Sequence, residues 1–177
     1  MKNFSSILLY IVVFPVLLHS CTQMHKSKRL SPPATASQKV GETTITISYG
    51  QPAVKGRTIG VNLEPFPDSL WRAGANEATV FEVDRDVLVE GKLLPKGKYA
   101  FFVSQKGGKS WILVFNKTWN QWGTKDYKES DDIFRVPVRG SKADLFEEKL
   151  VYKINPDGIV SLIWGEKQIN FQIQEKK

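Results

Sequence analysis

The stretch that decides the fold is residues 97–116, GKYAFFVSQKGGKSWILVFN. The Gly-Gly pair at 107–108 is typical of a tight hairpin turn between two strands. Taken as a two-residue turn, it pairs Phe102 with Leu113 and gives the hairpin two apolar faces. Both faces then need a cover. One cover is the core of a sandwich. The other is either the irregular segment Gln51–Gly74 or a ligand held in a concave sheet.

The same period of two continues outside this hairpin. Apolar and polar residues alternate over residues 43–50 and again near the C-terminus, and Gly- or Pro-containing turns separate the runs. The turn at 165–166 is expected to pair Leu162 with Ile169, and the best helical candidate is one turn after Asp68. We therefore predict an all-β fold, a two-layer antiparallel β-sandwich of jelly-roll type. It should have about nine strands and at most one or two short helical turns.

The charge is concentrated at the N-terminus. All 18 acidic residues lie from Glu42 onward, whereas four of the 25 basic residues precede Ser31. The remaining charges are interspersed and nearly balanced, so we expect no nucleic-acid partner. The acidic residues within 126–132 match no calcium-binding loop, and we expect them to form a solvated surface segment.

The positions of histidine and cysteine exclude several chemistries. His19, His25 and Cys21 are the only such residues, so the chain from Ser31 onward contains neither type. Thiol nucleophiles, Ser-His-Asp triads and nearly all zinc, copper and iron sites require them. We therefore expect neither a cofactor nor a bound metal.

Residues 1–20 have the features of a signal peptide. The apolar run Ile7–Leu18 is shorter than the roughly 20 residues that span a bilayer. It ends in Leu18-His19-Ser20-Cys21, which resembles the lipobox of bacterial lipoproteins, with His19 as the one departure. The alternatives are ordinary cleavage that leaves a free cysteine, and a retained membrane anchor.

The resemblance to a lipobox implies that Cys21 carries lipid and becomes the new N-terminus. Residues 21–30 would then form a tether, and residues 31–177 a single domain. The basic residues of the tether, Lys26, Lys28 and Arg29, either approach anionic headgroups or simply keep it soluble. Neither an aspartate nor an acidic run follows Cys21. This pattern implies a lipid-anchored envelope protein at the periplasmic face of the outer membrane.

Five stretches together carry a resemblance to a known family. They are SPPATASQ (31–38), YGQPAVKGR (49–57), WRAGANEAT (71–79), LPKGKY (94–99) and FNKTWNQWG (115–123). They resemble the bacterial envelope lipoprotein family catalogued as domain of unknown function 2911. The resemblance implies an envelope-associated β-sandwich and no agreed activity.

The loop that follows the hairpin suits a sugar. It combines aromatic faces, on which ring C–H groups stack, with amides that bind hydroxyls. In the Gly-Gly register Asn116 pairs with Tyr99, which places this loop beside Tyr99. The alternative is that the tryptophans plug the end of the sandwich while the amides cap turns.

The WRAGANEAT stretch supplies a second polar group of residues at a bend. An arginine there suits a carboxylate or phosphate ligand. The alternative is a structural Arg72–Glu77 pair, with Asn76 holding a tight turn. The loop and the bend are expected to converge, and the candidate ligand-binding residues are Arg57, Trp71, Arg72, Asn76, Glu77, Tyr99, Asn116, Trp119, Asn120, Gln121 and Trp122.

Three functions remain open from the sequence. The leading hypothesis is a non-enzymatic module that binds a glycan or another small envelope ligand. The second is a hydrolase that uses two carboxylates, with Glu77 as the candidate catalytic residue. The third is a structural or protein-partner lipoprotein without a small ligand. A deep pocket with two close carboxylates would favour the enzyme, and a groove lined by Trp119 and Trp122 would favour the glycan binder.

Overall fold

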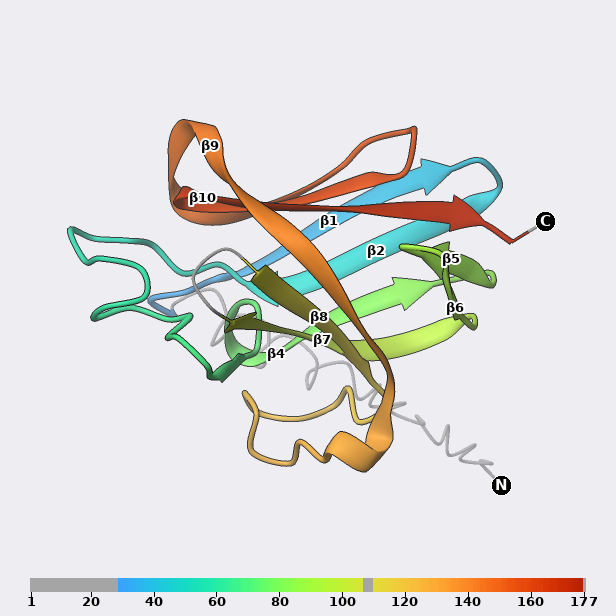
Figure 1. Ribbon diagram of the computed structural model, residues 1–177, viewed down its shortest axis with the longest axis horizontal. Coiled ribbons are helices and arrows are strands. Elements are labelled where there is room, and N and C mark those ends of the chain that lie inside the picture. The colour runs from blue at the N-terminus through green and yellow to red at the C-terminus, as the bar shows by residue number, and fades with distance from the viewer. Residues whose placement is uncertain (1–28, 107–109, 177) are drawn as a thin grey trace, which may run out of the picture.

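The computed structural model describes residues 29–106 and 110–176 (Figure 1). The proposed signal peptide, Cys21 and most of the tether lie outside this range. The described chain forms ten strands and one 3-10 turn. They are β1 (Pro33–Val40), β2 (Thr43–Gly50), β3 (Leu70–Trp71), β4 (Ala75–Val83), β5 (Val87–Val89), β6 (Lys92–Leu94), β7 (Gly97–Lys106), β8 (Ser110–Asn116), η1 (Glu129–Asp131), β9 (Asp132–Ile154) and β10 (Ile159–Glu175).

The strands form one open antiparallel sheet in the order β1-β2-β4-β7-β8-β9-β10-β5-β6, with β3 paired to β7. The sheet folds over, so strands that are distant in this order face one another. Phe171 of β10 lies 5.7 Å from Phe101 of β7, and Tyr152 of β9 lies 4.7 Å from Tyr49 of β2, between ring centroids. One hydrophobic core fills the space between the two layers. The predicted antiparallel β-sandwich is confirmed.

The central hairpin is buried on both faces, but its predicted register is wrong by one residue. Phe102 pairs with Val114 rather than Leu113, because Lys106 pairs with Ser110 and three residues lie between the strand ends. Phe101 and its same-face neighbours enter the main core. Phe102 and Val114 point to the other face, where they form a second, smaller cluster.

Protein side chains cover this second face. The ring of Tyr127 lies edge-on to Phe102 at 5.3 Å, and Leu70 packs against the same cluster. Leu70 comes from the 51–74 segment, which was one of the two covers considered for this face. Other apolar residues of that segment, including Val54 and Leu63, are buried in the main core instead.

Strands β9 and β10 form a long hairpin, and Figure 1 shows β9 crossing the molecule. The turn predicted at 165–166 is wrong, because β10 runs through it. Leu162 pairs with Tyr152 and Ile169 with Gly140. A glycine at positive φ is as suitable for a bulge as for a turn, and Gly165 (φ 58°) lies at such a register shift.

The predicted helical turn after Asp68 is also wrong, since Leu70 and Trp71 form β3 against β7. The helical turn of the described chain is η1, in the segment before β9. Within the described residues, no helix has the length and apolar character needed to span a membrane.

Candidate functional site

The two stretches singled out in the sequence lie against each other. The backbone N–H of Ala78 donates to the Gln121 carbonyl at 3.0 Å, and Gly123 N–H donates to the Asn76 carbonyl at 3.0 Å. These bonds hold the loop after β8 against the start of β4. The structure therefore brings WRAGANEAT and FNKTWNQWG together.

Asn76 holds the bend at this meeting point. Its φ of 66° is in the left-handed region, which asparagine tolerates better than most residues. Its side-chain Nδ2 donates to the Ser31 carbonyl at 2.9 Å, and its own carbonyl accepts from Arg72 Nη1 at 3.3 Å. Asn76 thus joins the start of the domain to the bend.

A groove of about 370 Å³ lies on the outer face of β1, β2 and β4. Its floor includes Thr35, Ser48 and Val80, which are neighbours across the three strands. Trp119 and Asn120 form one side. We call this depression the Trp119 groove. A tryptophan and an amide form its side, and its floor consists of small side chains.

The two tryptophans of the loop are exposed rather than buried in the end of the sandwich. The exposed fraction is 39% for Trp119 and 53% for Trp122. Lys98 Nζ lies 5.6 Å from the centroid of the Trp119 ring, and Arg29 Cζ lies 5.6 Å from that of Trp122. Each indole therefore has a cation near it. Trp119 borders the groove and Trp122 does not, so the expected groove lined by both tryptophans is found only in part.

Glu77 borders the groove and forms an ion pair with Arg29. Arg29 Nη1 donates to both carboxylate oxygens, at 2.8 and 2.7 Å. The expected Arg72–Glu77 pair is replaced by this contact, and Arg72 Nη2 lies 3.5 Å from Glu64 instead. Arg29 therefore belongs to the site, although the sequence placed it only in the tether.

Asn116 and Gln121 have structural roles. Asn116 is fully buried and donates to the Lys128 carbonyl at 2.9 Å. It pairs with Ala100, not with Tyr99 as expected. Gln121 Nε2 donates to the Thr118 carbonyl, and its side-chain oxygen accepts from Asp126 N–H at 3.2 Å. These amides cap turns, whereas Asn120 is exposed at the groove.

Tyr99 and Trp71 belong to the core. The Tyr99 hydroxyl donates to the Pro95 carbonyl at 2.8 Å, and burial raises the pKa of this phenol. Trp71 donates from Nε1 to the Gly74 carbonyl at 3.1 Å and stacks on Trp164 at 5.6 Å. Neither side chain borders the Trp119 groove.

The two arginines of the candidate set lie beside other cavities. Arg72 and Arg57 both border a cavity of about 330 Å³ next to Trp164. Among the described residues, Arg72 Nε and Trp164 Nε1 are buried without a hydrogen-bond partner. The Arg57 guanidinium donates to the Val54 and Ala53 carbonyls at 3.0 and 2.6 Å. These hydrogen bonds hold it against the backbone of its own loop.

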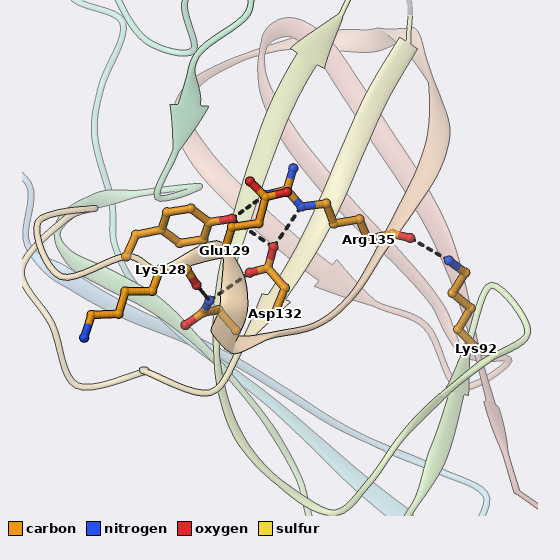
Figure 2. Close-up of polar contacts among 7 residues, drawn as sticks. Lys92, Lys128, Glu129, Asp132 and Arg135 are labelled. Carbon is orange, nitrogen blue, oxygen red and sulfur yellow. Dashed lines mark hydrogen bonds and ion pairs between the residues drawn. The ribbon is translucent and has the colours of Figure 1, made fainter.

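A polar network fixes the far end of the loop (Figure 2). Asp132 accepts from Asn116 Nδ2, from the Tyr127 hydroxyl and from Arg135 Nε, all at 2.8 Å. Burial, and then the adjacent Asp132, raise the pKa of Tyr127 to about 12. The expectation of a wholly solvated acidic segment is wrong at Asp132, because its side chain is 8% exposed.

The groove contains few side chains that could carry out acid–base chemistry or bind a metal ion. Glu77 is its one carboxylate among the described residues. Residues 29–106 and 110–176 also contain no group of three or more acidic or histidine side chains that could hold a metal ion.

Comparison with known proteins assigns the chain to a family. The family model described as a protein of unknown function (DUF2911) matches residues 31–173. The chain belongs to the DUF2911 family. No curated protein and no solved structure matches it. The family match covers both stretches that meet at the Trp119 groove, and its description names no activity.

In this DUF2911 protein the sequence predicted some of the residues that line the groove but not all of them. Ser48 on the floor belongs to a strand whose alternation indicated only a sandwich, and Thr35 belongs to a stretch that was used only for the family resemblance. Their relevance depends on strand pairing, which places them on the same face as Val80.

Proposed function

We propose that this DUF2911 protein is a lipid-anchored envelope module that binds a carbohydrate, without catalysis, in the Trp119 groove. The observation that carries the proposal is an exposed indole, Trp119, at the side of a concave surface with a small-residue floor. Aromatic faces accept the C–H surface of a sugar ring, and a groove of about 370 Å³ is within the usual size range of ligand sites.

Polar groups around the indole support a sugar rather than a purely apolar ligand. Asn120 has an exposed amide, and Ser48 and Thr35 contribute hydroxyls to the floor. Amides and hydroxyls both donate and accept hydrogen bonds, which matches the requirements of sugar hydroxyls. Glu77 adds an acceptor at the border of the groove.

The same geometry gives little support to the hydrolase hypothesis. Glycoside hydrolases generally place two carboxyl groups roughly 5–10 Å apart across the scissile bond. Here Glu77 is the one carboxylate of the groove among the described residues, and it forms an ion pair with Arg29. Binding without catalysis fits this arrangement better.

The position of the tether supports a site close to a membrane. Arg29 borders the groove and follows Cys21 by only eight residues. A flexible segment of that length has a reach of about 16 Å. If Cys21 carries lipid, the groove lies near the headgroups, and we place it at the periplasmic face of the outer membrane.

Titration of the full-length protein in phosphatidylcholine nanodiscs tests the proposal. The probes are soluble N-acetylglucosamine and glucose oligomers, followed by calorimetry and tryptophan fluorescence. We expect one series to bind and Trp119→Ala to weaken that binding about tenfold. Phe66→Ala is the matched control, because Phe66 is 40% exposed and does not border the groove. Equal weakening by both variants, or binding of no sugar, contradicts the proposal; the second result favours a structural or protein-partner role.

A further inference from the structure

A cavity larger than the Trp119 groove lies elsewhere on the described chain. Gly165 pairs with Glu147, and Lys167 pairs with Lys142. Between these pairs β10 contributes only Glu166, whereas β9 contributes residues 143–146, so β9 must arch away from β10. The space between this arch, Trp111 and the loop that contains Ile59 is a cavity of about 700 Å³. We call it the arch pocket.

The walls of the arch pocket are largely apolar. Val54, Ile59, Trp111 and Phe146 line it. Val54 and Trp111 are each 4% exposed and belong to the main core, whereas Phe146 is 57% exposed at the open side. The pocket therefore extends from solvent to the edge of the core.

Two glycines allow these walls to form. A Cβ atom on Gly140 would lie 2.1 Å from Trp111 Nε1, and one on Gly165 would lie 2.9 Å from Ile59 Cδ1. Both distances are shorter than any normal contact. Any side chain at either position would displace the residue that shapes the pocket.

The opening of the pocket is basic. Arg57, Lys142 and Lys167 line it together with one acidic residue, Glu166, which leaves a surplus of two positive charges. Lys142 Nζ lies 3.6 Å from Glu166, and both side chains are largely exposed. Lys167 Nζ lies 5.8 Å from the centroid of the Trp111 ring, so a cation adjoins the apolar wall.

We propose that the arch pocket binds a small anionic amphiphile, a carboxylate with a medium-length apolar chain. The chain would lie against Trp111, Ile59 and Phe146, and the carboxylate would lie near Lys142 and Lys167. A volume of about 700 Å³ is within the range of small-molecule sites. Apolar walls with a basic opening complement this class of ligand and disfavour a neutral sugar, so the proposal is independent of the Trp119 groove.

Photolabelling of the full-length protein in phosphatidylcholine nanodiscs tests the inference. The probe is a diazirine derivative of decanoic acid, and its methyl ester is the uncharged comparison. We expect the acid to label residues 54–59 and 141–146 about fivefold more than the ester, and unlabelled decanoate to displace it. Equal labelling by acid and ester, or labelling outside these residues, would overturn the proposal.

Variants distinguish specific binding in the arch pocket from nonspecific binding of the probe to the protein surface. The double variant Lys142→Gln/Lys167→Gln should lose the preference for the acid, whereas Lys39→Gln/Lys176→Gln, two lysines that do not line the pocket, should keep it. Ser141→Trp should block labelling because Ser141 is exposed and lines the pocket. Thermal unfolding checks that each variant folds. Undiminished labelling of Ser141→Trp contradicts the inference, and undiminished labelling of Trp119→Ala distinguishes this site from the sugar groove.

Discussion

Arg29 Nη1 donates to both carboxylate oxygens of Glu77, at 2.8 and 2.7 Å, across 48 positions of sequence. The same guanidinium lies over the Trp122 ring. The segment that leads from the proposed lipid anchor is therefore attached to the domain beside the Trp119 groove. The tether therefore meets the domain at the border of the groove, which Arg29 and Glu77 both line.

Glu77→Gln should loosen the tether with little effect on the fold. The Arg29 and Glu77 side chains are 24% and 44% exposed, and ion pairs of this kind contribute at most about 1 kcal/mol. We expect trypsin to cleave after Arg29 about twofold to fivefold faster in the native protein. Glu64→Gln, which removes the partner of Arg72, is the control. An unchanged cleavage rate would show that the pair does not hold the tether.

Asn116→Ala and Asn120→Ala should separate structure from binding. Asn116 is buried, and its Oδ1 also accepts from Thr118 N–H at 2.9 Å, so removal leaves buried groups unpaired and should cost about 1–3 kcal/mol. Asn120→Ala should change the free energy of unfolding by less than about 0.5 kcal/mol, yet weaken sugar binding. Urea denaturation measures the free energy of unfolding, and the oligosaccharide titration measures sugar binding. Comparable destabilisation by the two variants contradicts these assignments.

The sequence predicted both apolar faces of the central hairpin but could not determine its register. Where one face is polar, a slip of one residue exposes apolar side chains and is strongly disfavoured. Here Phe102 finds an apolar partner in either Leu113 or Val114, so the hydrophobic pattern permits both. The pairing of Lys106 with Ser110 decides it.

The meeting of the two site stretches was predicted from a pairing of Asn116 with Tyr99 that is wrong by one residue, an error too small to move the loop away from that end of the hairpin. The ion pairs of the site could not be predicted. The sequence pointed to Arg72 as the partner of Glu77, and only the folded position of the N-terminal segment selects Arg29. Asp132 likewise has the sequence context of a surface residue. Its side chain is enclosed by Tyr127 and Arg135, which are close in sequence, and by Asn116, which the pairing of β8 with β9 brings to it.

Tyr127→Phe should reduce the loss of stability at alkaline pH. The pKa of Tyr127 rises from an ordinary value near 10 to about 12, so the folded state retains a proton that the unfolded state releases. The stability associated with Tyr127 is full below pH 10 and is lost as pH rises towards 12. Denaturation between pH 9 and 12 should show a shallower decline in the variant. Burial also raises the pKa of Tyr49, Tyr99 and Tyr152, so a smaller decline should remain.

Cys21→Ala should release the protein from the membrane if the anchor is a lipid on this residue. Two or three acyl chains hold a protein far more firmly than one chain, whose binding is marginal. Membrane fractionation and intact mass should find wild type lipid-modified, lacking residues 1–20 and in the membrane fraction. Ser27→Ala, in the same tether, should behave like wild type. An unmodified, soluble wild-type protein would reject the anchor.

Gly140→Ala should destabilise the protein through a single steric conflict at the arch pocket. The added methyl group would lie 2.1 Å from Trp111 Nε1 and 2.6 Å from Cδ1, and Trp111 is only 4% exposed, so the indole has little room to move. Overpacking of this kind costs about 1–3 kcal/mol. Trp111→Leu removes the conflicting ring, but it also destabilises the protein because less apolar area is buried. The double variant should therefore lose less stability than the two single changes combined. Urea denaturation of the four proteins measures this coupling, with Ser141→Ala as the neighbouring control. Strict additivity would mean that a methyl group at Gly140 does not conflict with Trp111 and that Gly140 is required for another reason.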